Sequence, residues 1–170
     1  MDIIKVPDII TEGTAESIKR IVFERDFPWY YSPETVGNDA KNDKYQLVHP
    51  FFERGIYTSH SAQMMLSFFQ KLPEFKTHDL WRFKANLTSP YKVKMELLHI
   101  DNENIDSVSY LYYVHDCDGP TVFYPNWWRK IKIYPKQGLL IKFPSNIKHG
   151  GITPFKYDRR IIFTLIFHPK

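Results

Sequence analysis

Residues 95–101 read Met-Glu-Leu-Leu-His-Ile-Asp and end in a histidine and a carboxylate two positions apart. In an extended strand, side chains two residues apart point to the same face, so His99 and Asp101 can approach one point. They are two of the three ligands of a 2-His-1-carboxylate metal site, which leaves one face of the ion open to other ligands. Alone the pair is weak evidence, because chance gives roughly half a His-x-Asp triplet in a chain of this composition.

The residues before His99 are compatible with two interpretations. We expect a strand over 92–101, in which alternate side chains share a face. The predicted inward row consists of Val93, Met95, Leu97 and His99, with Lys94 and Glu96 on the other face. His99 can therefore be a core histidine hydrogen-bonded to a nearby carboxylate, or a metal ligand beside Asp101.

A second histidine follows in residues 138–154, which read Gly-Leu-Leu-Ile-Lys-Phe-Pro-Ser-Asn-Ile-Lys-His-Gly-Gly-Ile-Thr-Pro. We expect one strand to end at Pro144 and a short one to deliver His149. If the chain then ran straight on to Arg159, the two residues would lie roughly 33 Å apart, too far to serve one small ligand. A turn at Gly150-Gly151 and Pro154 is expected to bring them together.

Composition places the chain among globular proteins. It has 170 residues, of which 43% are hydrophobic and 25% charged, as expected for one folded domain. It has no run of eighteen apolar residues, its first residues do not resemble a signal peptide, and Cys117 is a single cysteine. We expect a cytoplasmic protein with no membrane segment and no internal disulfide.

The hydrophobic periodicity predicts helices first and strands afterwards. Residues 14–25 and 60–72 have helical spacing, with Thr11 or Thr14 and Ser59 or Ser61 as caps and Pro73 as a stop. Short segments rich in β-formers follow at 80–87, 92–101, 107–115, 121–124, 131–134, 138–143 and 159–168. We predict a single mainly β (α+β) domain, in which residues 1–79 form helices and loops that pack on one sheet of a β core of residues 80–170.

Charge is distributed unevenly along the chain. Residues 120–170 contain ten Lys and Arg but one acid, Asp158, a net charge of +9, whereas residues 1–119 have a net charge of −5. Two interpretations explain this bias equally well. The basic residues form a solvated face, or they form a site for an anion, either a small dicarboxylate or a nucleic acid.

The order of the motifs resembles that of the iron(II)- and 2-oxoglutarate-dependent dioxygenases, above all the prolyl-4-hydroxylase-like branch and its small uncharacterised members in phages and bacteria. The motifs are His-x-Asp at 99–101, Gly-x-x-x-x-Phe-Pro-Ser-x-x-x-His at 138–149 and an arginine ten residues later. They cover residues 81–168, and Phe-Pro-Trp-Tyr-Tyr at 27–31 is also similar. The resemblance implies a double-stranded β-helix core of the jelly-roll or cupin-like type.

The resemblance also implies roles for individual residues. His99, Asp101 and His149 would bind Fe(II), and Arg159 would hold the distal carboxylate of 2-oxoglutarate, a task that suits a planar guanidinium. Arg160 is the rival. Alternation sends the two arginines to opposite faces of a strand that is apolar on both, so parity does not choose between them. The family's offset of ten residues favours Arg159.

The strand at 107–115 resembles the family's Tyr-Leu-Asn strand, in which a tyrosine hydroxyl assists the anchoring arginine. This maps the tyrosine onto Tyr113, for which an aromatic that only fills the barrel is the alternative. His115 stands where the family often has Asn and is a less favoured metal ligand than His149. Asn86, on the strand before His99, is a weaker candidate for the pocket.

The chemistry implied is hydroxylation by Fe(II) and O₂, coupled to decarboxylation of 2-oxoglutarate to succinate. The primary substrate is unknown; the resemblance favours a protein side chain such as proline. The basic half and Trp-Trp-Arg-Lys at 127–130 would instead suit nucleic acid. In a different class of protein, a non-catalytic β-sandwich of a binding or virion module, the same His and Asp would be structural. If the chain is phage-encoded, its compartment is the host cytoplasm, and its oligomeric state is not indicated.

Overall fold

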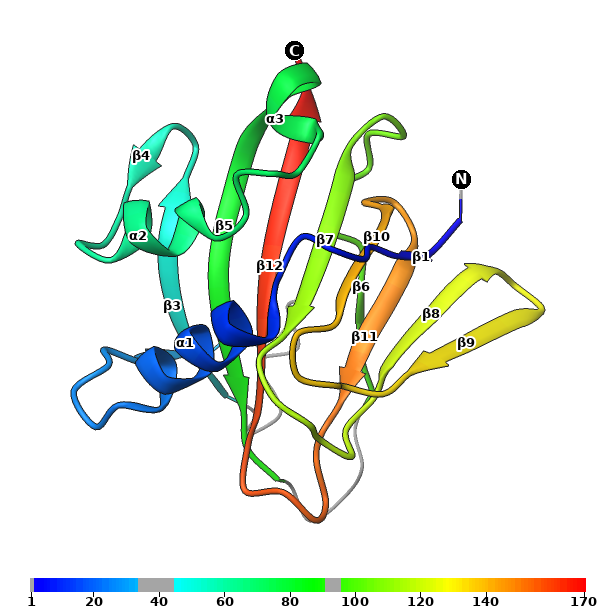
Figure 1. Cartoon of the computed structure of the whole chain (residues 1–170). Helices are drawn as coiled ribbons and strands as arrows, with labels where there is room; N and C mark the ends of the chain where they lie inside the picture. The colour runs from blue at the N-terminus through cyan, green and yellow to red at the C-terminus, as the bar shows by residue number, and fades with distance from the viewer. Residues whose placement is uncertain (1, 34–44, 91–95) are drawn as a thin grey trace.

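The computed structural model describes residues 2–33, 45–90 and 96–170, and this part of the chain forms two antiparallel sheets (Figure 1). The large sheet contains β1 (Ile4–Lys5), β2 (Tyr30–Ser32), β3 (Gln46–Glu53), β4 (Ile56–Tyr57), β5 (His78–Thr88), β7 (Val108–Tyr113), β10 (Leu140–Pro144) and β12 (Arg160–Pro169). The small sheet contains β6 (Glu96–His99), β8 (Thr121–Asn126), β9 (Arg129–Ile133) and β11 (Lys148–Ile152). The helices are α1 (Glu12–Phe23), α2 (Ala62–Ser67) and α3 (Glu74–Thr77).

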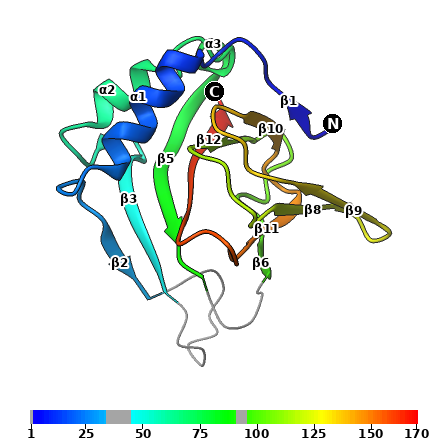
Figure 2. The same ribbon diagram turned by 60° about the horizontal axis from the view of Figure 1, so that its bottom comes forward.

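The strand order confirms the predicted jelly-roll core. In the large sheet the four core strands lie in the order β5-β12-β7-β10. The small sheet completes the roll with the order β6-β11-β8-β9. From β5 to β12 the chain therefore passes back and forth between the two sheets, except at the β8–β9 hairpin, as in a double-stranded β-helix. Figure 2 shows the helices outside the large sheet and the small sheet on its other side.

The two faces of β5 and β12 differ in chemistry, and this difference positions the pocket. Phe83 and Ala85 of β5 and Phe163 of β12 belong to the apolar core that also contains Ile18 of α1 and Met65 of α2. The alternate residues point toward the small sheet and line a cavity; they are Arg82, Lys84, Asn86, Thr88, Arg160, Ile162 and Thr164. One face of the strand pair thus packs against the helices, and the other lines the cavity with polar side chains.

The N-terminal helix follows the prediction closely. α1 begins after Thr11, whose side chain accepts a hydrogen bond from the backbone N–H of Thr14. The predicted helix at 60–72 is instead the short α2, followed by turns, and Pro73 precedes α3 rather than ending a long helix. Pro73 suits that position because a helix leaves its first N–H groups without partners anyway.

The N-terminal part also contributes strands, which the prediction of helices and loops for residues 1–79 did not include. β3 was missed because Pro50 interrupts its sequence, and the register of β3 on β5 shifts between Pro50 and Phe52. The glycines expected to form a turn lie within β11 itself, and the chain reverses after Ile152. Val93 and Met95, assigned to an inward row, fall outside the described residues.

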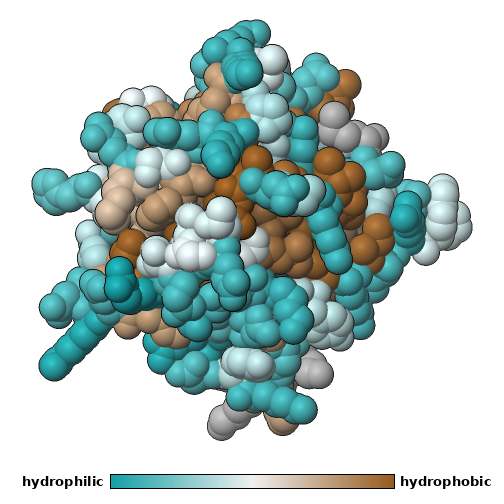
Figure 3. All heavy atoms as spheres, in the orientation of Figure 1, coloured by the Kyte–Doolittle hydropathy of each residue, from teal (hydrophilic) through white to brown (hydrophobic). Residues whose placement is uncertain are grey.

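The outer face of the large sheet is covered only in part. In the orientation of Figure 1, apolar atoms gather over the middle of the sheet beside the N-terminal segment and are surrounded by hydrophilic side chains (Figure 3).

Among the residues described, no helix combines the length and the apolar character needed to cross a lipid bilayer.

A buried ion pair joins α3 to the large sheet. Glu74 accepts hydrogen bonds from the phenol of Tyr110 and from the ammonium group of Lys142, and its side chain is 5% exposed. Burial alone would raise the pKa of Glu74, but the bonds from Lys142 and Tyr110 outweigh it and hold the pKa below its ordinary value. The same carboxylate, together with burial, raises the pKa of Tyr110.

We expect Glu74→Gln to lower the free energy of unfolding by about 1–3 kcal/mol at pH 7, because it leaves the Lys142 ammonium without its counter-charge. A carboxyl whose pKa is depressed by folding stabilises the protein above its unfolded pKa and loses this effect as pH falls through the folded value. The difference between wild type and Glu74→Gln should therefore shrink between pH 7 and pH 3 in urea unfolding. Glu16→Gln, at an exposed position, is the control; an undiminished difference at pH 3 would contradict the assignment.

Candidate metal centre

The three predicted ligands converge between the strands of the small sheet. His99 ends β6 and is the register partner of His149 in the adjacent β11, so the two imidazoles lie side by side with ring centroids 4.4 Å apart. Asp101 follows two residues after His99, and its backbone N–H donates to the carbonyl oxygen of Ser145 at 3.0 Å. Nε2 of His99 lies 3.5 Å from Oδ1 of Asp101, and Nε2 of His149 lies 3.7 Å from Oδ2.

The environment of His149 leaves the lone pair of its Nε2 atom available to a metal ion. Its Nδ1 atom lies 2.9 Å from the carbonyl oxygen of Ile147, which can only accept, so Nδ1 carries the proton and the Nε2 lone pair is free. The ring packs against Phe123 and Phe143. Burial lowers the pKa of His149, which keeps the imidazole neutral, the form that binds metals.

Asp101 is held in its ionised form. Burial raises the pKa of this carboxyl, but the adjacent His149 and His99 and a hydrogen bond from Ser109 outweigh it, and the pKa lies well below its ordinary value. Ser109 is itself fixed by a 2.8 Å hydrogen bond to Ser145, the serine of the Phe-Pro-Ser motif. The motif thus supports Asp101 twice, through the Ser145 carbonyl and through the Ser109 hydroxyl.

This donor set fits a metal ion. Oδ2 of Asp101 is buried and has no hydrogen-bond partner in the structure, which is unfavourable for a carboxylate unless a cation is bound there. Two ligands that each lie about 2.1 Å from one ion are at most about 4.2 Å apart. Both His–Asp distances are shorter than this, and the ligand atoms of all three residues lie within 4.8 Å of one another. Two imidazoles and one carboxylate are the ligands of non-haem ferrous sites.

Arg160, not Arg159, enters the pocket. Arg160 is the first residue of β12 and is 3% exposed. Its Nε atom donates to the carbonyl oxygen of Gly119 at 2.8 Å, and Nη2 donates to Oγ1 of Thr121 at 2.6 Å. No carboxylate of the described chain pairs with it, and burial lowers its pKa, although a guanidinium remains charged. Its other N–H groups are available to an anion in the pocket.

Arg159, predicted as the anchoring residue, lies outside this pocket. The Arg159 guanidinium forms an ion pair with Asp158 at 2.6 Å and lies over the ring of Phe23, on the side of the large sheet that faces α1. The strand begins one residue later than the family's offset suggests, so alternation turns Arg160 toward the small sheet.

Two glycines make room for the Arg160 side chain. A Cβ atom at Gly151 would lie 2.9 Å from Nη1 of Arg160, and one at Gly119 would lie 2.4 Å from the carbonyl oxygen of Ile152 and 3.2 Å from Cδ of Arg160. The contacts at 2.4 and 2.9 Å are closer than a Cβ atom tolerates without a shift of its neighbours. Gly151, expected to form a turn, instead allows a buried arginine to pass over β11.

The remaining predicted residues divide between the pocket and its surroundings. Tyr113 is fully buried and donates to Oγ1 of Thr121 at 2.7 Å, so it supports Arg160 through Thr121 and does not line the cavity. Burial raises the pKa of Tyr113 to about 12. His115 lies elsewhere: its Nε2 accepts from the backbone N–H of Ile161, and it does not join the metal ligands. Asn86 lines the pocket and donates to Oγ1 of Thr164 at 3.4 Å.

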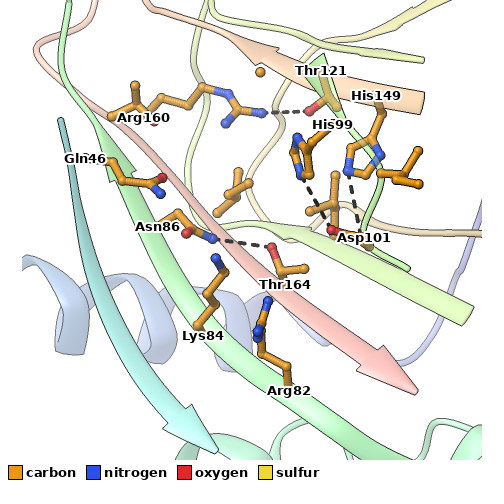
Figure 4. A pocket seen from close by; sticks show the side chains of 15 residues that line it. Gln46, Arg82, Lys84, Asn86, His99, Asp101, Thr121, His149, Arg160 and Thr164 are labelled. Carbon is orange, nitrogen blue, oxygen red and sulfur yellow. Dashed lines mark hydrogen bonds and ion pairs between the residues drawn. The ribbon is translucent and has the colours of Figure 1, made fainter. Parts of the chain in front are cut away.

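The cavity has a volume of about 250 Å³ and is lined by both sheets. The metal ligands lie on one side and the side chains of β5 and β12 on the other (Figure 4). Sequence reasoning missed Lys84 and Arg82, although the alternation of Arg82, Lys84, Asn86 and Thr88 with apolar residues gave the signal of a polar face. Burial lowers the pKa of Lys84 and the Arg82 charge lowers it further, which outweighs the opposite effect of the Asp101 and Glu53 carboxylates.

Neither a protein-family model nor a curated protein sequence matches this chain. Solved structures do. A prolyl hydroxylase from Trichoplax adhaerens, in complex with a peptide of hypoxia inducible factor, aligns with a TM-score of 0.72 at 18% identity, over 98% of this chain and 83% of that one. An oxidoreductase of the 2OG-Fe(II) oxygenase family from Burkholderia pseudomallei aligns with a TM-score of 0.71 at 14% identity, over 98% and 86%.

HygX from Streptomyces hygroscopicus, solved with nickel and 2-oxoglutarate bound, aligns with a TM-score of 0.66 at 11% identity, over 99% of this chain and 83% of that one. At these identities the similarities establish that the chain has the jelly-roll fold of the 2-oxoglutarate oxygenases.

Replacing His149 by Ala should weaken Fe(II) binding by more than about 100-fold, since loss of a residue that merely supports a ligand already has 10–100-fold effects. Anaerobic calorimetric titration of the metal-free protein with Fe(II) measures this. His115→Asn and the exposed His60→Ala should bind Fe(II) as the wild type does. Normal binding by His149→Ala, or its loss in His115→Asn, would show that the ligand set is wrong.

Proposed function

We propose that this protein is an Fe(II)- and 2-oxoglutarate-dependent oxygenase that hydroxylates its substrate. The observation that carries the proposal is Arg160, a buried guanidinium that lacks a carboxylate partner in the described chain and shares a pocket with His99, Asp101 and His149. Such a cation calls for an anionic ligand. A dicarboxylate with one end at the metal and the other at Arg160 would supply an anionic partner to each of these two cations.

Residues of this chain would divide the work. His99, Asp101 and His149 would hold Fe(II) on one face, and Arg160 would hold the distal carboxylate of 2-oxoglutarate, oriented by Thr121, which Tyr113 orients in turn. Bound iron would supply activation of O₂, with one oxygen atom passing to succinate and the other to the substrate as CO₂ is released. Leu111 and Ile162 give the pocket apolar walls that limit the access of water.

A non-catalytic β-sandwich is the competing interpretation. Structural histidines and aspartates ordinarily complete their hydrogen bonds within the protein. The orphaned Oδ2 of Asp101 and the guanidinium of Arg160, which has no acidic partner among the described residues, face one cavity instead. Both features favour an enzyme that binds a metal and a co-substrate.

For the primary substrate we propose a protein side chain such as proline, supported by the prolyl hydroxylase of similar fold that binds a peptide. The lone, buried Cys117 fits a reducing compartment such as the cytoplasm. A nucleic-acid substrate finds support in Trp127 and Trp128, which are 90% and 69% exposed between β8 and β9. Because that hairpin projects beyond the rest of the small sheet (Figure 2), its tryptophans are the weaker indication, and we favour the protein side chain.

Arg160→Met should raise the dissociation constant for 2-oxoglutarate by about 10- to 100-fold, because it removes a charge-assisted pair of hydrogen bonds. The visible charge-transfer band of the anaerobic Fe(II)·2-oxoglutarate complex measures this constant. Arg159→Met, which removes the same charge one residue away at the surface, should change it less than about twofold.

If Arg159→Met binds 2-oxoglutarate more weakly and Arg160→Met binds it normally, then Arg159 is the anchoring residue, as the ten-residue offset of the family predicts. If the wild-type protein forms no Fe(II)·2-oxoglutarate complex at all, the proposed activity is wrong.

A further inference from the structure

We propose that Lys84 forms a second anion subsite in the pocket, which binds a carboxylate or phosphate group of the primary substrate. The inference rests on the proposed function and adds to it the chemical class of the substrate: a protein segment or molecule that carries a negative charge near the position to be oxidised. Three features support it: the position of Lys84, the lack of an ion-pair partner for it among the described residues, and the balance of charge in the pocket.

Lys84 and Arg160 lie on the same face of the large sheet but at separate places. In the register of β5 on β12, Lys84 is opposite Thr164, and Arg160 is four residues earlier in the strand. Their backbones are therefore about 13 Å apart. Both side chains line the cavity that contains the metal ligands (Figure 4). A ligand held by Arg160 and the metal thus leaves Lys84 to a different group.

The charges in the pocket leave Lys84 as the unmatched cation. Arg82 is paired with Glu53 at 2.9 Å. Two positive charges of Fe(II) are matched by Asp101 and one carboxylate of 2-oxoglutarate, and Arg160 is matched by the other carboxylate. Among the residues that the structure describes, Lys84 has neither an ion-pair partner nor a hydrogen bond. One positive charge therefore remains when metal and co-substrate are bound.

A partly buried ammonium group with no partner among the described residues destabilises a protein unless a ligand compensates it. The side chain opposite Lys84 offers a further donor: Oγ1 of Thr164 accepts from Nδ2 of Asn86 at 3.4 Å, which leaves the Thr164 hydroxyl proton for a ligand. An ammonium group and a hydroxyl on neighbouring strands suit an oxyanion. A neutral substrate group, such as an unmodified amide, would leave both unsatisfied.

The subsite can be tested with small anions before the substrate is known. The protein is loaded anaerobically with Fe(II) and saturating 2-oxoglutarate, and the band of that complex confirms loading. Binding of propionate, propionamide and methyl phosphate is then measured by saturation-transfer NMR at low ionic strength. We expect propionate to bind about tenfold or more tightly than the isosteric propionamide, because only the anion forms a charge-assisted bond with Lys84. Comparison with methyl phosphate decides between a carboxylate and a phosphate.

Lys84→Met should abolish the preference for the anion and leave the dissociation constant of 2-oxoglutarate within about twofold of wild type. Lys132→Met, which removes one exposed lysine from β9, should change neither and controls for net charge. An equal affinity of wild type and Lys84→Met for propionate would overturn the proposal. So would a loss of 2-oxoglutarate affinity in Lys84→Met comparable to that of Arg160→Met, since Lys84 would then belong to the co-substrate site.

A second readout does not depend on added ligands. If Lys84 has no partner, Lys84→Met should raise the melting temperature of the metal-free protein, because an apolar side chain of similar length replaces an uncompensated charge. A lower melting temperature than that of Lys132→Met would show that Lys84 is paired within the chain, and would overturn the subsite. If the wild-type complex with Fe(II) and 2-oxoglutarate does not form, the failure lies with the proposed function; if it forms and the anion does not bind, only the subsite fails.

Discussion

The pairing of β12 with β5 is the constraint on which the rest of the molecule depends. Along this ladder each side chain must lie on one of two faces, and the two faces have opposite chemistry. Phe83 and Phe163 on one side hold α1 and α2 against the sheet. Arg160, Lys84 and Asn86 on the other side face the small sheet. The helices are therefore part of the same arrangement that directs two cations toward the metal ligands.

Charge is concentrated in this pocket beyond what the described residues neutralise. Asp101 is an ionised carboxylate with an orphaned oxygen, and it faces two imidazoles whose Nε2 atoms point to it. Arg160 is positive and buried, and its neighbours Thr121 and Gly119 offer neutral oxygens only. Groups of this kind are expensive to bury unless a ligand completes them. The cavity is best understood as part of a complex whose other components are a cation and at least one anion.

Structural support for the site comes from residues that touch no ligand. Ser145 and Ser109 fix Asp101, the Ile147 carbonyl sets the tautomer of His149, and Tyr113 orients Thr121. These residues belong to β7, β10 and the segments that follow them, which explains why the Phe-Pro-Ser motif accompanies the ligands although it binds nothing itself. Gly151 has a similar role, because the absence of a side chain is what admits Arg160.

The sequence by itself determined the fold class, the positions of most strands from residue 78 onward and the three candidate metal ligands, because these depend on local properties. Alternation, turn residues and the spacing of His and Asp are read along one strand at a time. It did not reveal β3, where Pro50 obscures a strand that the sheet stabilises, and it favoured Arg159, which lies outside the pocket. Only the tertiary structure decided between Arg159 and Arg160 and placed Lys84 in the pocket. The reason is that the face on which a residue lies depends on the residue at which its strand begins and on its register with β5, and both are set by contacts between segments far apart in the chain.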